Sequence, residues 1–206
     1  MKVKVWLKPY KKQVRRVLLW VGTAFTLGTL LIWGITHNLA QADQRVGHSW
    51  NQIRRIVQRQ LDLMQEVPAL LRRDFPEFKK PLGLLESSYQ RLLDLHIVLS
   101  GPLDQSQLRE YEKAQLEMTV TAQRVLRTVP EDEPFAGKDR FQEWIGSYKG
   151  TQRLLQAEKE RYNSLASGYN QLYHFFFIQW VAQRFNLQDR PLFKQDGARK
   201  RVRQLL

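Results

Sequence analysis

The sequence predicts an all-α protein in which a single N-terminal transmembrane helix precedes an antiparallel, up-down four-helix bundle with long helices. Three observations lead to this fold class. An apolar run near the N-terminus is free of charge, most of the remaining chain spaces its apolar residues with helical periodicity, and proline-containing breaks separate the periodic segments. The length of 206 residues suits one ordinary domain with appendages.

The anchor helix is predicted over residues 17–36, "VLLWVGTAFTLGTLLIWGIT", which contain no charged side chain. A helix of this length spans about 30 Å, the thickness of the hydrocarbon core of a bilayer. Trp20 and Trp33 lie near its two ends, where indole rings favour the membrane interface. A cleaved signal peptide is the alternative, with a small-x-small site ending at Ala42, but its apolar region would normally be about 7–15 residues long.

The positive charge is concentrated at the two ends of the chain. Residues 1–16 contribute +7 and residues 194–206 contribute +4 to the total of +13, so residues 17–193 carry only +2. By the positive-inside rule, residues 1–16 are cytoplasmic and the remaining domain lies outside the cytoplasmic membrane. This orientation and the nearly neutral body argue against a nucleic-acid partner, which the overall charge alone would suggest.

The bundle is predicted over residues 42–185. Its first helix has one apolar face and can continue directly from the anchor, with a kink at Pro68 and an end at the proline-rich turn 74–83. Two further helices follow, separated by "SGPLD" at 100–104, and the third ends at the acidic, proline-bounded loop 129–137.

The fourth helix begins near Lys138 and carries the strongest periodicity. Six heptads place aromatic and aliphatic residues in one column, which contains Phe141, Tyr148, Leu155, Tyr162, Tyr169 and Phe176. Thr151 and Glu158 are polar residues in the column three positions on, and Gln115 of the third helix is a plausible partner for Glu158. Gly146 and Gly150 predict either a close helix approach or a break.

The Tyr-Asn pair at 162–163 recurs at 169–170, two helical turns later. The tyrosines belong to the apolar seam, so their rings are expected in the core. Asn163 and Asn170 lie beside the seam and can bond to a neighbouring helix or loop. We interpret the repeat as a packing and register device.

An even number of helices returns the fourth helix toward the membrane. Its end and the basic tail 186–206 are therefore candidates for contact with the lipid surface, although the phenylalanines at 175–177 can equally close the bundle core. The candidate surface residues are Phe175, Phe176, Phe177, Trp180, Arg199, Lys200, Arg201 and Arg203.

No motif in the sequence supports catalysis. The four histidines form no metal-binding motif, and a phosphate-binding loop and a nucleophile elbow are also missing. The absence of cysteine excludes disulfides and thiolate metal sites. We expect no cofactor and no small-molecule substrate.

Four segments are informative when they are taken together: "HSWNQIRRIVQRQLDLM" (48–64), "AEKERYN" (157–163), "GYN" (168–170) and "RPLF" (190–193). In their order and approximate spacing they resemble the LemA family of bacterial envelope proteins. Departures such as Thr151-Gln152, where the family has Thr-Glu, indicate a divergent member. The residues that carry the resemblance are Trp50, Asp62, Thr151, Tyr162, Asn163, Tyr169, Asn170 and Pro191.

The resemblance implies a membrane-tethered helical bundle without catalytic activity. We therefore expect a scaffold or interaction module of the cell envelope that contacts the lipid bilayer and either a protein partner or its own copies. A periplasmic ligand-sensing bundle that signals through a partner is the alternative. A polar cavity among Gln115, Thr151 and Glu158 would favour it.

Overall fold

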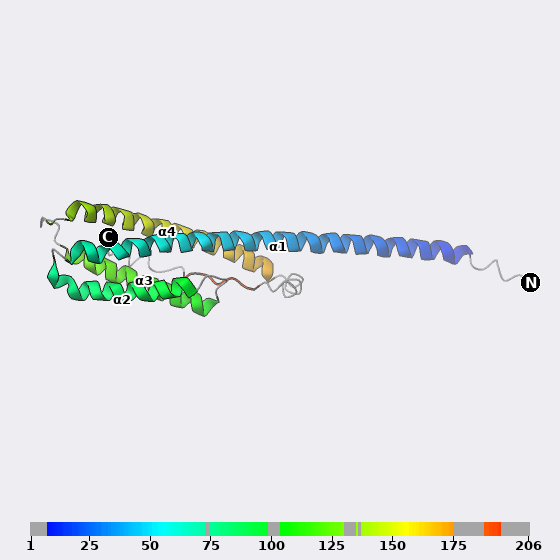
Figure 1. Ribbon diagram of the computed structural model, residues 1–206. Helices are drawn as coiled ribbons and strands as arrows, with labels where there is room; N and C mark the ends of the chain where they lie inside the picture. Colours follow the sequence, from blue (N-terminus) through cyan, green and yellow to red (C-terminus); the bar gives the residue numbers. More distant parts are fainter. Residues whose placement is uncertain are drawn as a thin grey trace, which may run out of the picture.

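The computed structural model describes residues 8–72, 75–98, 104–129, 135, 137–174 and 188–194 (Figure 1). These residues form four α-helices and one short 3-10 helix. The α-helices are α1 (Lys8–Leu71), α2 (Lys79–Val98), α3 (Gln105–Thr128) and α4 (Lys138–Tyr173), and η1 (Pro76–Phe78) precedes α2. The all-α prediction is confirmed, because the described residues contain no strand.

Helix α1 has two parts with different surroundings. It is 64 residues long, which corresponds to about 96 Å. Its first part extends alone beyond the bundle, and its second part forms one wall of the bundle (Figure 1). The isolated part is long and apolar enough to cross a membrane.

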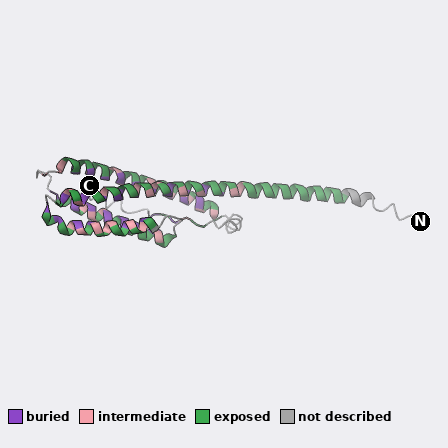
Figure 2. Cartoon of the chain, in the orientation of Figure 1, coloured by how far each residue is buried: buried purple, intermediate pink, exposed green. Residues whose placement is uncertain are grey.

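The burial pattern along α1 changes where the helix enters the bundle. Apolar residues between positions 13 and 33 are exposed in the isolated chain, Trp20 to 76%. From Leu39 onward a buried stripe follows one face of the helix, and the exposed part and the bundle are distinct in Figure 2. The stripe contains Leu39, Ala42, Val46, Trp50, Ile53, Val57, Leu61, Met64, Val67 and Leu71. One helix therefore carries both an all-round apolar segment and an amphipathic segment.

The bundle is built from two closely packed helix pairs. Helix α1 packs mainly against α4, and α2 packs mainly against α3, while α1 also contacts α2. At the end away from the isolated part of α1, Phe75 stacks on Phe78 and meets Phe135 edge to face. The indole nitrogen of Trp144 in α4 donates a hydrogen bond of 2.7 Å to the carbonyl of Leu63 in α1.

Two expected irregularities do not interrupt the helices. Helix α1 continues past Pro68 to Leu71, and α4 runs without a break through Gly146 and Gly150. A Cβ atom at either glycine would have no neighbouring atom within 4 Å, so these glycines do not provide a close helix approach. The start of α3 is marked in the sequence, because Asp104 caps the helix and forms a capping box with Gln107.

Helix α4 returns to the region where α1 leaves the bundle, as an up-down arrangement requires. Leu172 in its last turn lines a small apolar groove with Ile35 and Leu39 of α1. The end of α4 therefore lies level with the last turn of the predicted membrane span.

Candidate functional site

A short segment after α4 lies against the bundle. We call residues 188–194 the strap; they lie within the segment 186–206 that we predicted as a basic tail. The strap runs along α1 and α4 near the end of the bundle from which α1 emerges (Figure 1). Its Arg190 contacts Asp43 of α1, and Phe193 contacts Trp50. The strap is therefore parallel to α1 and antiparallel to α4.

The two asparagines of the Tyr-Asn repeat bind the strap main chain. The Asn170 side chain donates to the carbonyl of Arg190 at 2.8 Å and accepts from its N–H at 2.9 Å. The Asn163 side chain does the same for Phe193, with both distances at 2.9 Å. Each side-chain amide therefore satisfies the donor and the acceptor of one strap residue.

The spacing of the two asparagines matches the spacing of the main-chain groups that they bind. Seven residues along a helix rise about 10.5 Å. Three residues of extended chain, here from Arg190 to Phe193, cover about 9–10 Å. The seven-residue repeat therefore recognises two strap residues that are three apart.

The strap is also held by its arginine. The Nε group of Arg190 donates to the Asp43 carboxylate at 2.9 Å, and a terminal nitrogen of the same guanidinium contacts the same oxygen. The guanidinium lies 5.8 Å from the centre of the Tyr169 ring. The side chains of Arg190 and Asp43 are 18% and 24% exposed, so this ion pair is partly protected from water.

Phe193 occupies an aromatic slot between α1 and α4. Its ring centre lies 5.3 Å from that of Tyr162 and 6.2 Å from that of Trp50, and Phe193 is only 3% exposed. The Lys159 ammonium lies 5.0 Å from the centre of the Phe193 ring. Burial raises the pKa of Tyr162 to about 12, so its hydroxyl is protonated near neutral pH.

Helix α3 binds the other side of the strap. The Gln105 side chain donates to the carbonyl of Leu192 and accepts from its N–H, both at 3.3 Å. Glu112 accepts a hydrogen bond of 3.1 Å from the N–H of Lys194. Pro191 is buried between the bound residues and has no N–H that would need a partner. We call the contact surface on the three helices the strap groove; it comprises Asp43, Trp50, Gln105, Glu112, Lys159, Tyr162, Asn163 and Asn170.

The polar seam residues do not form one cluster. Glu158 accepts a hydrogen bond of 2.7 Å from Ser49, whereas the side-chain oxygen of Gln115 accepts from the Lys159 ammonium. These partners replace the Gln115–Glu158 pair that we expected. Thr151 is buried and donates to the Tyr148 carbonyl at 2.8 Å within its own helix. Asp62 is exposed and accepts from Gln58.

A second polar group crosses the bundle interior. His96 of α2 is 6% exposed, and its Nδ1 lies 3.1 Å from the Tyr111 hydroxyl of α3. Arg54 of α1 approaches the His96 carbonyl at 3.5 Å. Burial lowers the pKa of His96, and the nearby positive charge of Arg54 lowers it further, against a smaller opposing effect of Asp62.

Some buried polar atoms have no hydrogen-bond partner within the described part of the chain. They are the Trp50 Nε1, the Arg54 Nε, both side-chain amide atoms of Gln60, the Gln115 Nε2 and the Tyr169 hydroxyl. In the described part of the chain, no group of three or more His, Asp or Glu side chains could hold a metal ion.

The predicted lipid-surface residues lie outside the described residues. These are Phe175, Phe176, Phe177, Trp180, Arg199, Lys200, Arg201 and Arg203.

Fold and groove together define a class of protein: an all-helical bundle whose first helix extends as an apolar segment of membrane-spanning length and whose C-terminal strap is bound across three helices. A model of the LemA family matches residues 49–204, which include most of the bundle and the strap. The chain therefore belongs to the LemA family, as its sequence motifs predicted. No match to the chain was found among curated proteins or among solved structures.

Several groove residues escape sequence reasoning. Asp43, Gln105 and Lys159 contact an extended segment, and such contacts leave no periodic signal in the helices that supply them. The family resemblance is the one sequence feature that pointed to this segment. Its motif "RPLF" at 190–193 is the part of the strap that the groove binds.

We predict that Asn163→Ala and Asn170→Ala each weaken strap binding. Each change leaves one partly buried N–H and one partly buried carbonyl without this partner, at a cost of about 1–3 kcal/mol. In hydrogen exchange, the Phe193 amide should exchange about 5- to 150-fold faster in Asn163→Ala, and the Arg190 amide should do so in Asn170→Ala. Asn51→Ala, at an exposed position of α1, is the control. Unchanged protection of both amides would contradict the assignment.

We predict that the protein loses stability in mild acid because of His96. Its pKa is lowered in the folded chain, so the unfolded chain takes up the proton first as the pH falls. The free energy of unfolding should therefore decrease as the pH drops below about 6.5, the usual histidine pKa. Urea unfolding of wild type and His96→Gln at pH 7.5 and 5.5 measures the difference. An equal decrease in both proteins would exclude His96 as the source, and His48→Gln, at an exposed position, is the matched control.

Proposed function

We propose that this LemA family protein is a non-enzymatic, single-span protein of the bacterial cell envelope that acts as a scaffold or interaction module outside the cytoplasmic membrane. The observation that carries the proposal is the continuity of α1 from Lys8 to Leu71. A rigid helix that belongs to both the apolar segment and the bundle would hold the bundle at a defined height above the bilayer.

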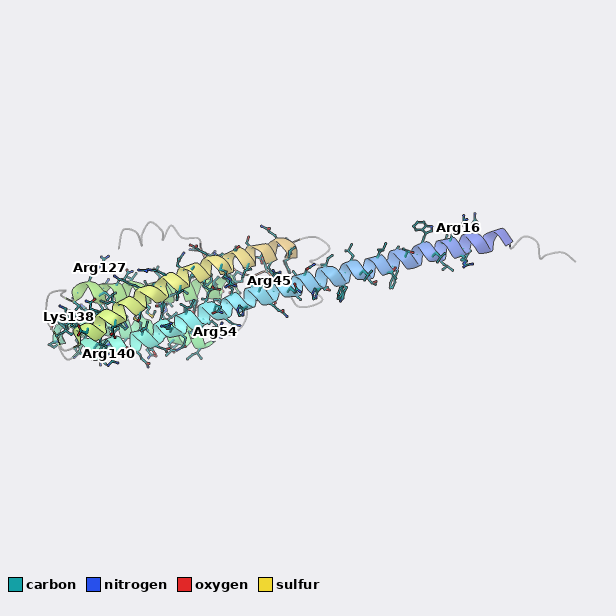
Figure 3. All side chains as sticks on the ribbon, turned by 90° about the horizontal axis from the view of Figure 1, so that it is seen from above. Arg16, Arg45, Arg54, Arg127, Lys138 and Arg140 are labelled. Carbon is teal, nitrogen blue, oxygen red and sulfur yellow. The ribbon has the colours of Figure 1, made fainter. Side chains whose placement is uncertain are left out.

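The charge distribution supports the orientation. Arg16 and Arg45 lie far apart on α1, on either side of the apolar part of the helix (Figure 3). Residues 17–42 between them contain no Asp, Glu, Lys or Arg. Seven basic residues precede this stretch, so the positive-inside rule assigns the N-terminus to the cytoplasm.

The site geometry supports an interaction role over ligand sensing. Gln115, Thr151 and Glu158 bond to three different neighbours, Lys159, Tyr148 and Ser49, and not to one another. The strap groove, in contrast, recognises an extended peptide segment through main-chain hydrogen bonds, an arginine contact and an aromatic slot, which are the means by which proteins bind peptides.

The orientation can be tested with reporters fused to the C-terminus. We expect alkaline phosphatase, which is active only outside the cytoplasm, to be active, and the full-length chain to resist carbonate extraction from the membrane. An N-terminal tag retained at full mass would exclude cleavage after Ala42. Changing Lys11, Lys12, Arg15 and Arg16 to Gln should reduce the phosphatase signal. A cytoplasmic reporter that is active in the unmodified chain would overturn the orientation.

The proposed lipid contact of the basic tail is tested separately. Deleting residues 174–206 would also remove the strap, so charge neutralisation is the sharper experiment. We expect the fragment 37–206 to bind vesicles with anionic lipid. Changing Arg199, Lys200, Arg201 and Arg203 to Gln should weaken binding strongly, because each charge contributes about 1 kcal/mol. Lys79→Gln/Lys80→Gln, at exposed positions of α2, is the control. Unchanged binding to anionic vesicles would exclude the tail contact.

A further inference from the structure

We propose that the strap of one copy of this protein occupies the strap groove of a second copy, so that neighbouring chains are linked by exchanged straps. The proposal rests on the membrane anchoring proposed above and identifies the partner as another copy of the same chain. Four features of the structure support it.

First, the groove recognises a short local segment. It contacts Arg190, Leu192, Phe193 and Lys194 with side chains from α1, α3 and α4. All of these contacts depend only on the residues of the strap and not on which chain supplies them. A second copy presents the identical strap, as in domain swapping, so the exchanged complex retains the same interactions.

Second, the contact between the strap and the residue that ends α4 is weak. His174 at the end of α4 lies 3.5 Å from Asp189, but their side chains are 59% and 54% exposed. An ion pair at this exposure contributes little, and only when the histidine is protonated. Among the described residues, the strap is therefore held by the groove, which includes Asn163 and Asn170 of α4, and only weakly by His174.

Third, the chain is long enough to reach a neighbour. Thirteen residues, 175–187, separate His174 from Gln188. Because an extended residue spans at most about 3.3–3.6 Å, they can bridge up to about 45 Å. Two side-by-side helices are roughly 20–25 Å wide. The strap can therefore extend past its own bundle to an adjacent one.

Fourth, anchoring aligns the grooves of neighbouring chains. Asp43 follows the end of the predicted span, Thr36, by seven residues, which places it about 10 Å above that point. Every copy carries its groove at this same height. Confinement to a plane at a common height raises the effective concentration of one strap at another groove.

Single cysteines test the exchange, because the chain has none of its own. One copy carries Gln105→Cys and one tag, and the other carries Leu192→Cys and a second tag. Both are co-expressed, and a short bis-maleimide is added to the isolated membranes. We expect a crosslinked dimer with both tags. The yield of this dimer should be at least about fivefold higher than the yield from a control pair. In the control, Leu84→Cys, at an exposed position near the start of α2, replaces Gln105→Cys. Adding Arg190→Ala/Phe193→Ala to the strap copy should abolish the excess.

A dimer yield equal to the Leu84→Cys control, or one that does not depend on Arg190 and Phe193, would overturn the proposal. A chain with both Gln105→Cys and Leu192→Cys shows whether the reagent can bridge the two positions when the strap is in its groove. Only material that pellets with the membrane is scored. Failure of anchoring, which would contradict the proposed function, is thereby separated from failure of exchange.

A complementation experiment gives a second measurement without cysteines. One tagged copy has an inactive groove, Asn163→Ala/Asn170→Ala, and an intact strap. The other has an intact groove and an inactive strap, Arg190→Ala/Phe193→Ala. We expect these two copies to purify together from detergent extracts, whereas two groove-inactive copies should not. Equal recovery of the two pairs, or recovery of neither, would contradict strap exchange.

Discussion

The continuity of α1 is the constraint on which the rest of the structure depends. A single helix of 64 residues carries an apolar surface all round in its first part and a buried stripe in its second. Because the helix does not end between the two parts, the direction in which it leaves the apolar segment also sets the axis of the bundle. The up-down connections then return the end of α4 to Leu39, and the strap groove forms beside that point.

The strap completes a bundle that consists of two helix pairs. Helices α1 and α4 form one close pair and α2 and α3 the other. The strap touches both pairs, because Asn163 and Asn170 come from α4 while Gln105 and Glu112 come from α3. The Tyr-Asn repeat consequently has two functions. The tyrosine rings fill the core, and the asparagines one position further around the helix bind the segment that joins the pairs.

The sequence predicted the features that arise from periodicity and missed those that arise from the extended segment. The apolar run, the stripe from Val46 to Met64 and the heptads of α4 define the helices, because each reflects one repeating environment. The sequence also placed Asn163 and Asn170 beside the seam. It could not identify Asp43 or Gln105 as their partners in binding the strap, because contacts 147 and 87 residues apart leave no local pattern. The expected Gln115–Glu158 pair was wrong for a related reason, since Ser49 and Lys159 lay equally within reach.

The energetics of the strap explain why its aromatic residue matters as much as its hydrogen bonds. Ordering seven residues costs roughly 7–14 kcal/mol of conformational entropy. The main chain of the strap makes seven hydrogen bonds to the groove, each worth about 1 kcal/mol net. These bonds alone offset only the lower end of that cost. Burial of Phe193 adds roughly 2–3 kcal/mol, which brings the two sides close to balance. Because the hydrogen bonds alone do not exceed the entropy cost, burial of Phe193 and the partly buried Arg190–Asp43 pair decide whether the strap is bound. A change in either contact shifts the occupancy of the groove.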